Sequence, residues 1–67
     1  MNIQVYNRTN NVGFSLKRIL NEIDLIRDEA VALSKTHPEE ASTVKALNSV
    51  SKNISSAVHI LEDILDY

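Results

Sequence analysis

Hydrophobic residues recur at alternating steps of four and three along two stretches of this 67-residue chain. Such a pattern puts apolar side chains on one stripe of an α-helix and is typical of helices that pack against a partner. The two series are Val12, Leu16, Ile19, Ile23, Ile26, Ala30 and Leu33, then Thr43, Leu47, Val50, Ile54, Ala57, Leu61 and Ile64. They predict one helix over residues 12–35 and another over residues 38–65.

The stretch 36–38 separates the two predicted helices. Pro38 suits the first turn of a new helix, because its missing N–H needs no partner there. Thr36 and Glu39 have the spacing of a capping box. A connection this short makes the helices antiparallel neighbours. The chain therefore predicts an all-α antiparallel hairpin that forms a single domain over residues 1–67.

The first eleven residues break the helical pattern. Ile3, Val5 and Tyr6 lie among several asparagines, and asparagine favours turns and helix caps. We expect residues 1–11 to form an extended arm that docks on a helix, with Asn10 or Asn11 as the N-cap of the first helix.

Two helices cannot enclose a core by themselves, and a chain of this size needs an additional source of stability. The chain has no cysteine, so disulfides cannot supply it. The second helix has an apolar face wider than one partner would cover. We therefore predict a homo-oligomeric helical bundle. Its predicted interface residues are Leu47, Val50, Ile54, Val58, Leu61 and Leu65.

Composition disfavours several functional classes. His37 and His59 are the only histidines, and no motif places either beside a second metal ligand, so we expect no metal, no cofactor and no enzymatic activity. The acids Glu62, Asp63 and Asp66 lack the alternating oxygen ligands of a calcium loop. A pI of about 5.5 disfavours duplex DNA. No segment reaches the roughly 20 apolar residues of a membrane span, so we expect a cytoplasmic protein.

Charge is distributed unevenly along the chain. Residues 1–21 carry three basic side chains and no acidic one, whereas residues 22–40 carry six acids against two bases. Within the basic part, one aromatic ring accompanies the cations, a combination that can stack a base and hold phosphate oxygens. The candidate ligand-binding residues are Tyr6, Arg8, Lys17 and Arg18. The alternative is that Tyr6 packs on the hairpin and the cations keep the first helix in solution.

The arrangement resembles the small helical anti-CBASS sponges of phages, whose hairpin domain is similar to part of the anti-Thoeris sponges. The resemblance rests on the polar start with Tyr6 and Arg8, the turn Pro38-Glu39-Glu40, and a second helix containing Ile54-Ser55-Ser56-Ala57-Val58-His59-Ile60. The chain has Glu39-Glu40 and Ile60 where that family has an Arg-Glu pair and an aromatic residue.

The resemblance implies a homo-oligomer that sequesters cyclic di- or trinucleotide immune signals between subunits in the host cytoplasm, without cleaving them. In that case Tyr6 would stack a base, and Lys17 or Arg18 would meet a phosphate. The residues themselves leave a second possibility open, a small inhibitor or adaptor that docks its apolar face on a host protein.

Overall fold

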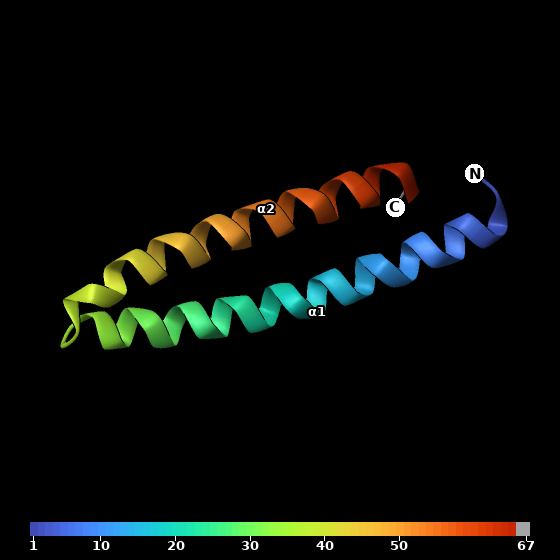
Figure 1. Cartoon of the computed structure of the whole chain (residues 1–67). Helices are drawn as coiled ribbons and strands as arrows, with labels where there is room; N and C mark the ends of the chain where they lie inside the picture. The colour runs from blue at the N-terminus through green and yellow to red at the C-terminus, as the bar shows by residue number, and fades with distance from the viewer. Residues whose placement is uncertain (66–67) are drawn as a thin grey trace.

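The computed structural model describes residues 1–65, which form a hairpin of two long helices (Figure 1). Helix α1 spans Ile3–Ser34, a 3-10 turn η1 spans Pro38–Glu40, and helix α2 spans Ala41–Leu65. The helices lie side by side and antiparallel, giving a rod of 51 × 14 × 14 Å. The predicted all-helical hairpin is confirmed, and Asp66 lies outside the described residues.

The predicted N-terminal arm is wrong, because α1 begins at Ile3 rather than near residue 12. The side chain of Asn2 caps this helix: its Oδ1 accepts hydrogen bonds from the backbone N–H of Gln4 at 2.8 Å and of Val5 at 3.3 Å. Thr9 stays compatible with the helix because its hydroxyl donates to the carbonyl of Val5 at 2.7 Å. An asparagine inside a helix costs well under about 1 kcal/mol, so Asn10 and Asn11 do not stop it.

The turn closes through backbone hydrogen bonds at the end of α1. The N–H of His37 donates to the carbonyl of Leu33 at 2.8 Å, and the N–H of Glu40 donates to the carbonyl of His37 at 2.9 Å. Pro38 occupies the start of η1, as expected. The predicted capping box is absent, because His37 is the N-cap and no side chain caps this turn, while the Thr36 hydroxyl lies 2.9 Å from His37 Nδ1.

The interior of the hairpin is thin. Among residues 1–65 the buried apolar side chains are Ala30, Val58 and Leu65, and none of the described side chains is completely removed from solvent. Gly13 is also buried. Half-buried residues complete the contact between the helices; they are Leu16, Leu20 and Ile23 on α1, and Val44, Leu47, Ser51, Ile54 and Leu61 on α2. The intrachain seam therefore follows its own alternation of fours and threes.

Each helix is rotated relative to the predicted seam. Leu16, Ile23 and Ala30 face α2 as the first series predicts, but Val12, Ile19, Ile26 and Leu33 are left exposed. On α2 the side chains that face α1 come one residue after Thr43, Val50, Ala57 and Ile64 of the predicted series; they are Val44, Ser51, Val58 and Leu65. Both helices have an apolar face wider than one seam, so burying one half of it leaves the other half in solvent.

Candidate functional site

Several of the hydrophobic residues that the hairpin leaves in solvent follow one row along α1 and one row along α2. On α1 this row consists of five aliphatic side chains that follow one another every seven residues and are 41% to 52% exposed. They are Val5, Val12, Ile19, Ile26 and Leu33. On α2 the same spacing gives Thr43, Val50, Ala57 and Ile64, of which Val50 is 39% and Ile64 54% exposed.

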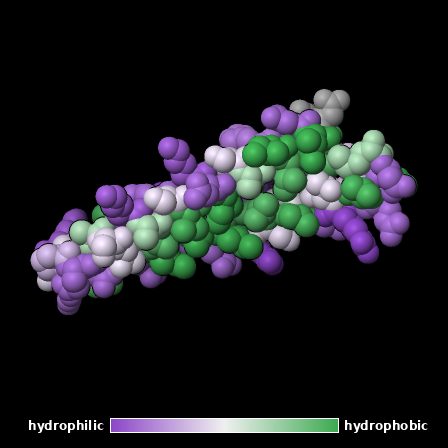
Figure 2. All heavy atoms as spheres, turned by 45° about the horizontal axis from the view of Figure 1, so that its top comes forward, coloured by the Kyte–Doolittle hydropathy of each residue, from purple (hydrophilic) through white to green (hydrophobic). Residues whose placement is uncertain are grey.

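Antiparallel geometry brings these two rows to the same side of the molecule. On each helix the exposed row comes one residue before a row of the intrachain seam: Val12 precedes Gly13, and Ala57 precedes Val58. In an antiparallel helix pair, equivalent flanking positions of the two helices meet along one edge. We call this surface of nine residues the apolar edge. Figure 2 shows hydrophobic side chains gathered in a band along the middle of the rod.

The opposite edge is polar. Two side-chain contacts cross this edge: Lys17 Nζ lies 3.8 Å from Glu62 Oε1, and the hydroxyl of the seam residue Ser51 donates to Asp24 Oδ1 at 2.8 Å. Arg27 adds a contact within α1, with its Nη1 3.4 Å from Asp24 Oδ1. The two edges of one hairpin thus differ in chemistry. The polar edge already has partners within the chain, and the apolar edge is exposed.

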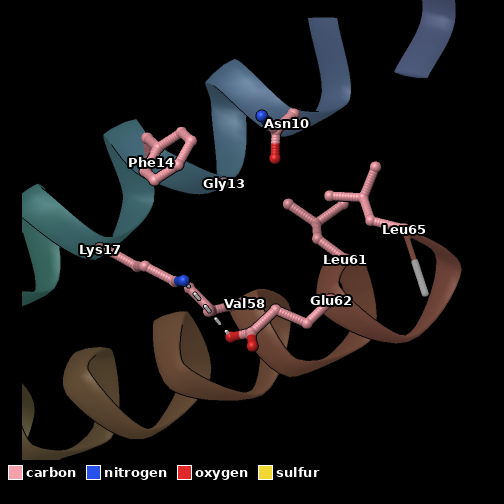
Figure 3. Close-up of a pocket in the computed structure, with 8 residues that line it drawn as sticks. All are labelled: Asn10, Gly13, Phe14, Lys17, Val58, Leu61, Glu62 and Leu65. Carbon is pink, nitrogen blue, oxygen red and sulfur yellow. Dashed lines mark ion pairs between the residues drawn. The ribbon is translucent and has the colours of Figure 1, made fainter. Parts of the chain in front are cut away.

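A small hollow opens beside the polar edge, near the open end of the hairpin (Figure 3). Its lining residues are Asn10, Gly13, Phe14, Lys17, Val58, Leu61, Glu62 and Leu65. The hollow measures about 10 Å³, which is the size of one water molecule, whereas small-molecule sites usually have about 300 to 1,000 Å³. One hairpin therefore offers no nucleotide-sized pocket here.

Two polar groups at this hollow are of interest. Lys17 Nζ lies 5.8 Å from the centre of the Phe14 ring, within the range of a cation–π contact. Asn10 Oδ1 points toward Leu61 and Leu65, and it is buried without a hydrogen-bond partner among residues 1–65 (Figure 3). The asparagine that sequence reasoning takes for a helix cap is therefore part of the interior of the hairpin.

The structure does not bring the four predicted ligand-binding residues together within one chain. All four lie on the single continuous helix α1. Tyr6 and Lys17 point in similar directions, about 20° apart around the axis, but are separated by about 16 Å along it. Arg8 lies roughly 160° around the helix from Tyr6, and both Arg8 and Arg18 are exposed. A shared ligand would require residues from a second chain.

The predicted oligomer interface is largely used inside the hairpin. Val58 and Leu65 are buried, and Leu47, Ile54 and Leu61 are half-buried. Of the predicted set, Val50 alone is on the apolar edge. The sequence signal that identifies the exposed surface is the unbroken seven-residue spacing from Val5 to Leu33, and Val5 lies within the predicted arm.

Other candidate chemistry is dispersed. His37 lies in the turn and His59 on α2, and both side chains are exposed. Residues 1–65 contain no group of three or more histidines and acids arranged to hold a metal ion. Within the same range, neither helix has a stretch long and apolar enough to cross a bilayer.

Comparison of the chain with models of protein families, with curated proteins and with solved structures gave no match.

Proposed function

We propose that this protein is a non-catalytic helical association module that acts by packing its apolar edge against another helix or helix pair. The observation that carries this proposal is the row of five half-exposed aliphatic side chains, evenly spaced from Val5 to Leu33. Single exposed hydrophobic residues are normal on any protein surface. A row of this length with a constant seven-residue spacing is typical of a seam that a partner helix occupies.

The spacing also describes the partner. A straight α-helix has 3.6 residues per turn, so a row repeated every seven residues drifts slowly around it and matches a helix that coils around it with a left-handed twist. The row on α2 lies on the same side of the hairpin as the row on α1, so a bound helix can contact both rows. A partner with its own apolar seam fits this surface, as helices do in hydrophobic grooves.

The dispersed titratable groups favour binding over catalysis. Catalytic sites need an acid, base or nucleophile within hydrogen-bond reach of a reacting group in a cavity that admits substrate. The hollow beside Lys17 and Glu62 is the size of a water molecule, and the exposed histidines are on separate elements. We therefore assign the protein no reaction and no cofactor.

A photo-crosslinking experiment tests the proposed function. A benzophenone amino acid replaces Ile26 on the apolar edge or, as the control, its exposed neighbour Leu25, which faces outward on the same helix turn. In cells that produce the full chain, irradiation should yield adducts from position 26 and few from position 25. Equal or absent adducts at both positions would show that the apolar edge is not an association surface.

The second candidate is the sequestration of a cyclic nucleotide between copies of the chain, as the resemblance to phage sponges implies. Its support is that Arg8 and Arg18 are exposed and that neither forms an ion pair with another residue of 1–65. Guanidinium groups of this kind suit bidentate contacts to phosphate. Tyr6 and Lys17 of the same helix would supply the stacking ring and a further cation.

Calorimetric titration with cyclic di- and trinucleotides tests this second candidate. Micromolar binding should be lost when both Arg8 and Arg18 are replaced by alanine, and kept in the control Lys52→Ala, which removes an exposed cation from α2. If no cyclic nucleotide binds the unaltered protein, or if the double variant binds as well as the control, this assignment is wrong.

A further inference from the structure

We infer that the partner that covers the apolar edge is a second copy of this chain, packed so that α1 runs antiparallel to α1 of the partner subunit about a two-fold axis at Ile19. This inference rests on the proposed function and specifies the occupant of the same surface. Four features of the described residues support it: the symmetry of the row, the charge pattern of α1, the unequal lengths of the helices, and the exposed area.

The row on α1 is symmetric about its middle member. Ile19 is third of the five residues, with two more at steps of seven on either side. A two-fold interface is self-complementary, so a residue that contacts a second one is contacted by it in return. With the axis at Ile19, that residue meets its own counterpart, Val12 meets Ile26 of the partner subunit, and Val5 meets Leu33 of the partner subunit. All five positions are thereby covered.

Charge selects the antiparallel orientation. The part of α1 up to residue 21 carries Arg8, Lys17 and Arg18 and no acid, whereas residues 22–34 carry four acids and Arg27. An antiparallel copy places Arg8 within one residue's rise of Glu29 of the partner subunit, while Lys17 and Arg18 lie close to the axis, where Lys17 already contacts Glu62 of its own chain. A parallel copy would place like charges side by side, which disfavours association.

The unequal lengths of the two helices also support an antiparallel dimer. α1 has 32 residues and α2 has 25, and the amino end of α1 extends beyond the last described turn of α2 (Figure 1). Val5 lies on this overhang, 52% exposed. In the antiparallel dimer the overhang lies beside the turn end of the other α1. The segment that α2 leaves uncovered thus gains a neighbour.

The exposed area of the chain is larger than expected for a compact monomer of its mass. The chain exposes 5013 Å². A folded monomer of 7.5 kDa is expected to expose about 4,200 Å². The rod shape of 51 × 14 × 14 Å contributes to this excess of roughly 800 Å². The excess is similar to the area that each partner buries in an interface of standard size, so the chain has enough exposed surface for one such interface.

Cysteine crosslinking tests the orientation directly, because the chain contains no cysteine of its own. Ile19→Cys should form a disulfide-linked dimer rapidly under mild oxidation, since the two side chains meet at the axis. Val12→Cys alone should not, because two copies of position 12 lie about 21 Å apart in the antiparallel dimer and a disulfide spans at most about 7 Å between Cα atoms. A mixture of Val12→Cys and Ile26→Cys chains should crosslink to each other.

Two measurements accompany the crosslinking. Leu25→Cys is the matched control, as an exposed residue on the outer face of α1, and it should remain monomeric in a denaturing gel. Light scattering of the unaltered chain should give twice the 7.5 kDa mass of one chain at micromolar concentration. Circular dichroism of each variant checks that the helices are retained.

The outcomes separate this inference from the proposed function. Self-crosslinking of Val12→Cys at the rate of Ile19→Cys would overturn the antiparallel dimer in favour of a parallel one. A monomeric mass together with an unreactive Ile19→Cys would overturn the second copy as partner. If position 26 still gives photo-adducts with a different protein, association through the apolar edge stands with another occupant; if it gives none, both proposals fail.

Discussion

The Ser51 hydroxyl donates a hydrogen bond to Asp24 Oδ1 at 2.8 Å, joining the two helices between residues 27 positions apart in the sequence. The bond lies on the polar edge, and the Lys17–Glu62 contact lies about two helical turns further along α1 on the same side. These two contacts favour one rotation of each helix about its own axis. In that rotation the polar side chains meet on the polar edge, and the exposed apolar rows lie on the apolar edge.

Loss of the Ser51 hydroxyl should weaken the hairpin. Ser51→Ala leaves the Asp24 carboxylate without this partly buried donor, and we expect a loss of about 1 kcal/mol in the free energy of unfolding. Ser49→Ala is the matched control, because that hydroxyl donates within α2 to the carbonyl of Lys45. Urea unfolding followed by circular dichroism measures both. Equal stability of the two variants would show that the Asp24 contact contributes nothing.

Replacing Val58 by alanine should lower the free energy of unfolding more than replacing Val31 by alanine. Val58 is 6% exposed and lies in the thin interior of the hairpin, whereas Val31 is 41% exposed. Val58→Ala removes two buried methyl groups, so we expect about 2 kcal/mol of destabilisation. Val31→Ala should change stability by a few tenths of a kcal/mol at most, since alanine favours the helix. Thermal unfolding at one fixed protein concentration compares them, and a reversed order would contradict the seam described above.

Gly13→Ala should stabilise the protein. Gly13 lies inside α1, where glycine is about 1 kcal/mol less favourable than alanine. A Cβ atom added at this position meets nothing within 4 Å. We therefore expect a gain of roughly 1 kcal/mol in the free energy of unfolding, measured by urea titration. A destabilised Gly13→Ala variant would mean that another chain or a ligand packs against this glycine.

Asn2 should determine where α1 begins. Asn2→Ala removes the acceptor of the Gln4 and Val5 amide hydrogens, so the first turn should fray and these amides should exchange with solvent several-fold faster. Asn2→Asp keeps an acceptor and adds a negative charge that the helix N-terminus favours, so it should preserve protection. Amide exchange by NMR measures both. Unprotected amides over residues 4–9 in the unaltered protein would restore the extended arm.

The start of α1 illustrates a local ambiguity in the sequence. Asparagine favours both helix caps and turns, so a cluster at residues 7, 10 and 11 indicates several possible helix starts. Asn2 precedes them and has the same capping ability. The Thr9 hydroxyl donates to the carbonyl of Val5 inside the helix, so this residue is accommodated within α1. Propensity alone cannot rank these alternatives, because each differs from the others by less than about 1 kcal/mol.

The hydrophobic spacing by itself determined two helices, their lengths over most of the chain, and the antiparallel turn at Pro38. These features follow from local periodicity, and the structure confirms them. Only the tertiary structure decided which apolar row faces inward. Ile19 of the exposed row and Leu20 of the intrachain seam are adjacent on a wide apolar face, and both rows repeat every seven residues. The hydrophobic spacing therefore does not distinguish them. Contacts between residues far apart in the sequence, such as Asp24 with Ser51, favour the observed rotation of the helices about their axes. The free energy of such a contact depends on the position of both helices, so the pattern within one helix does not reveal it.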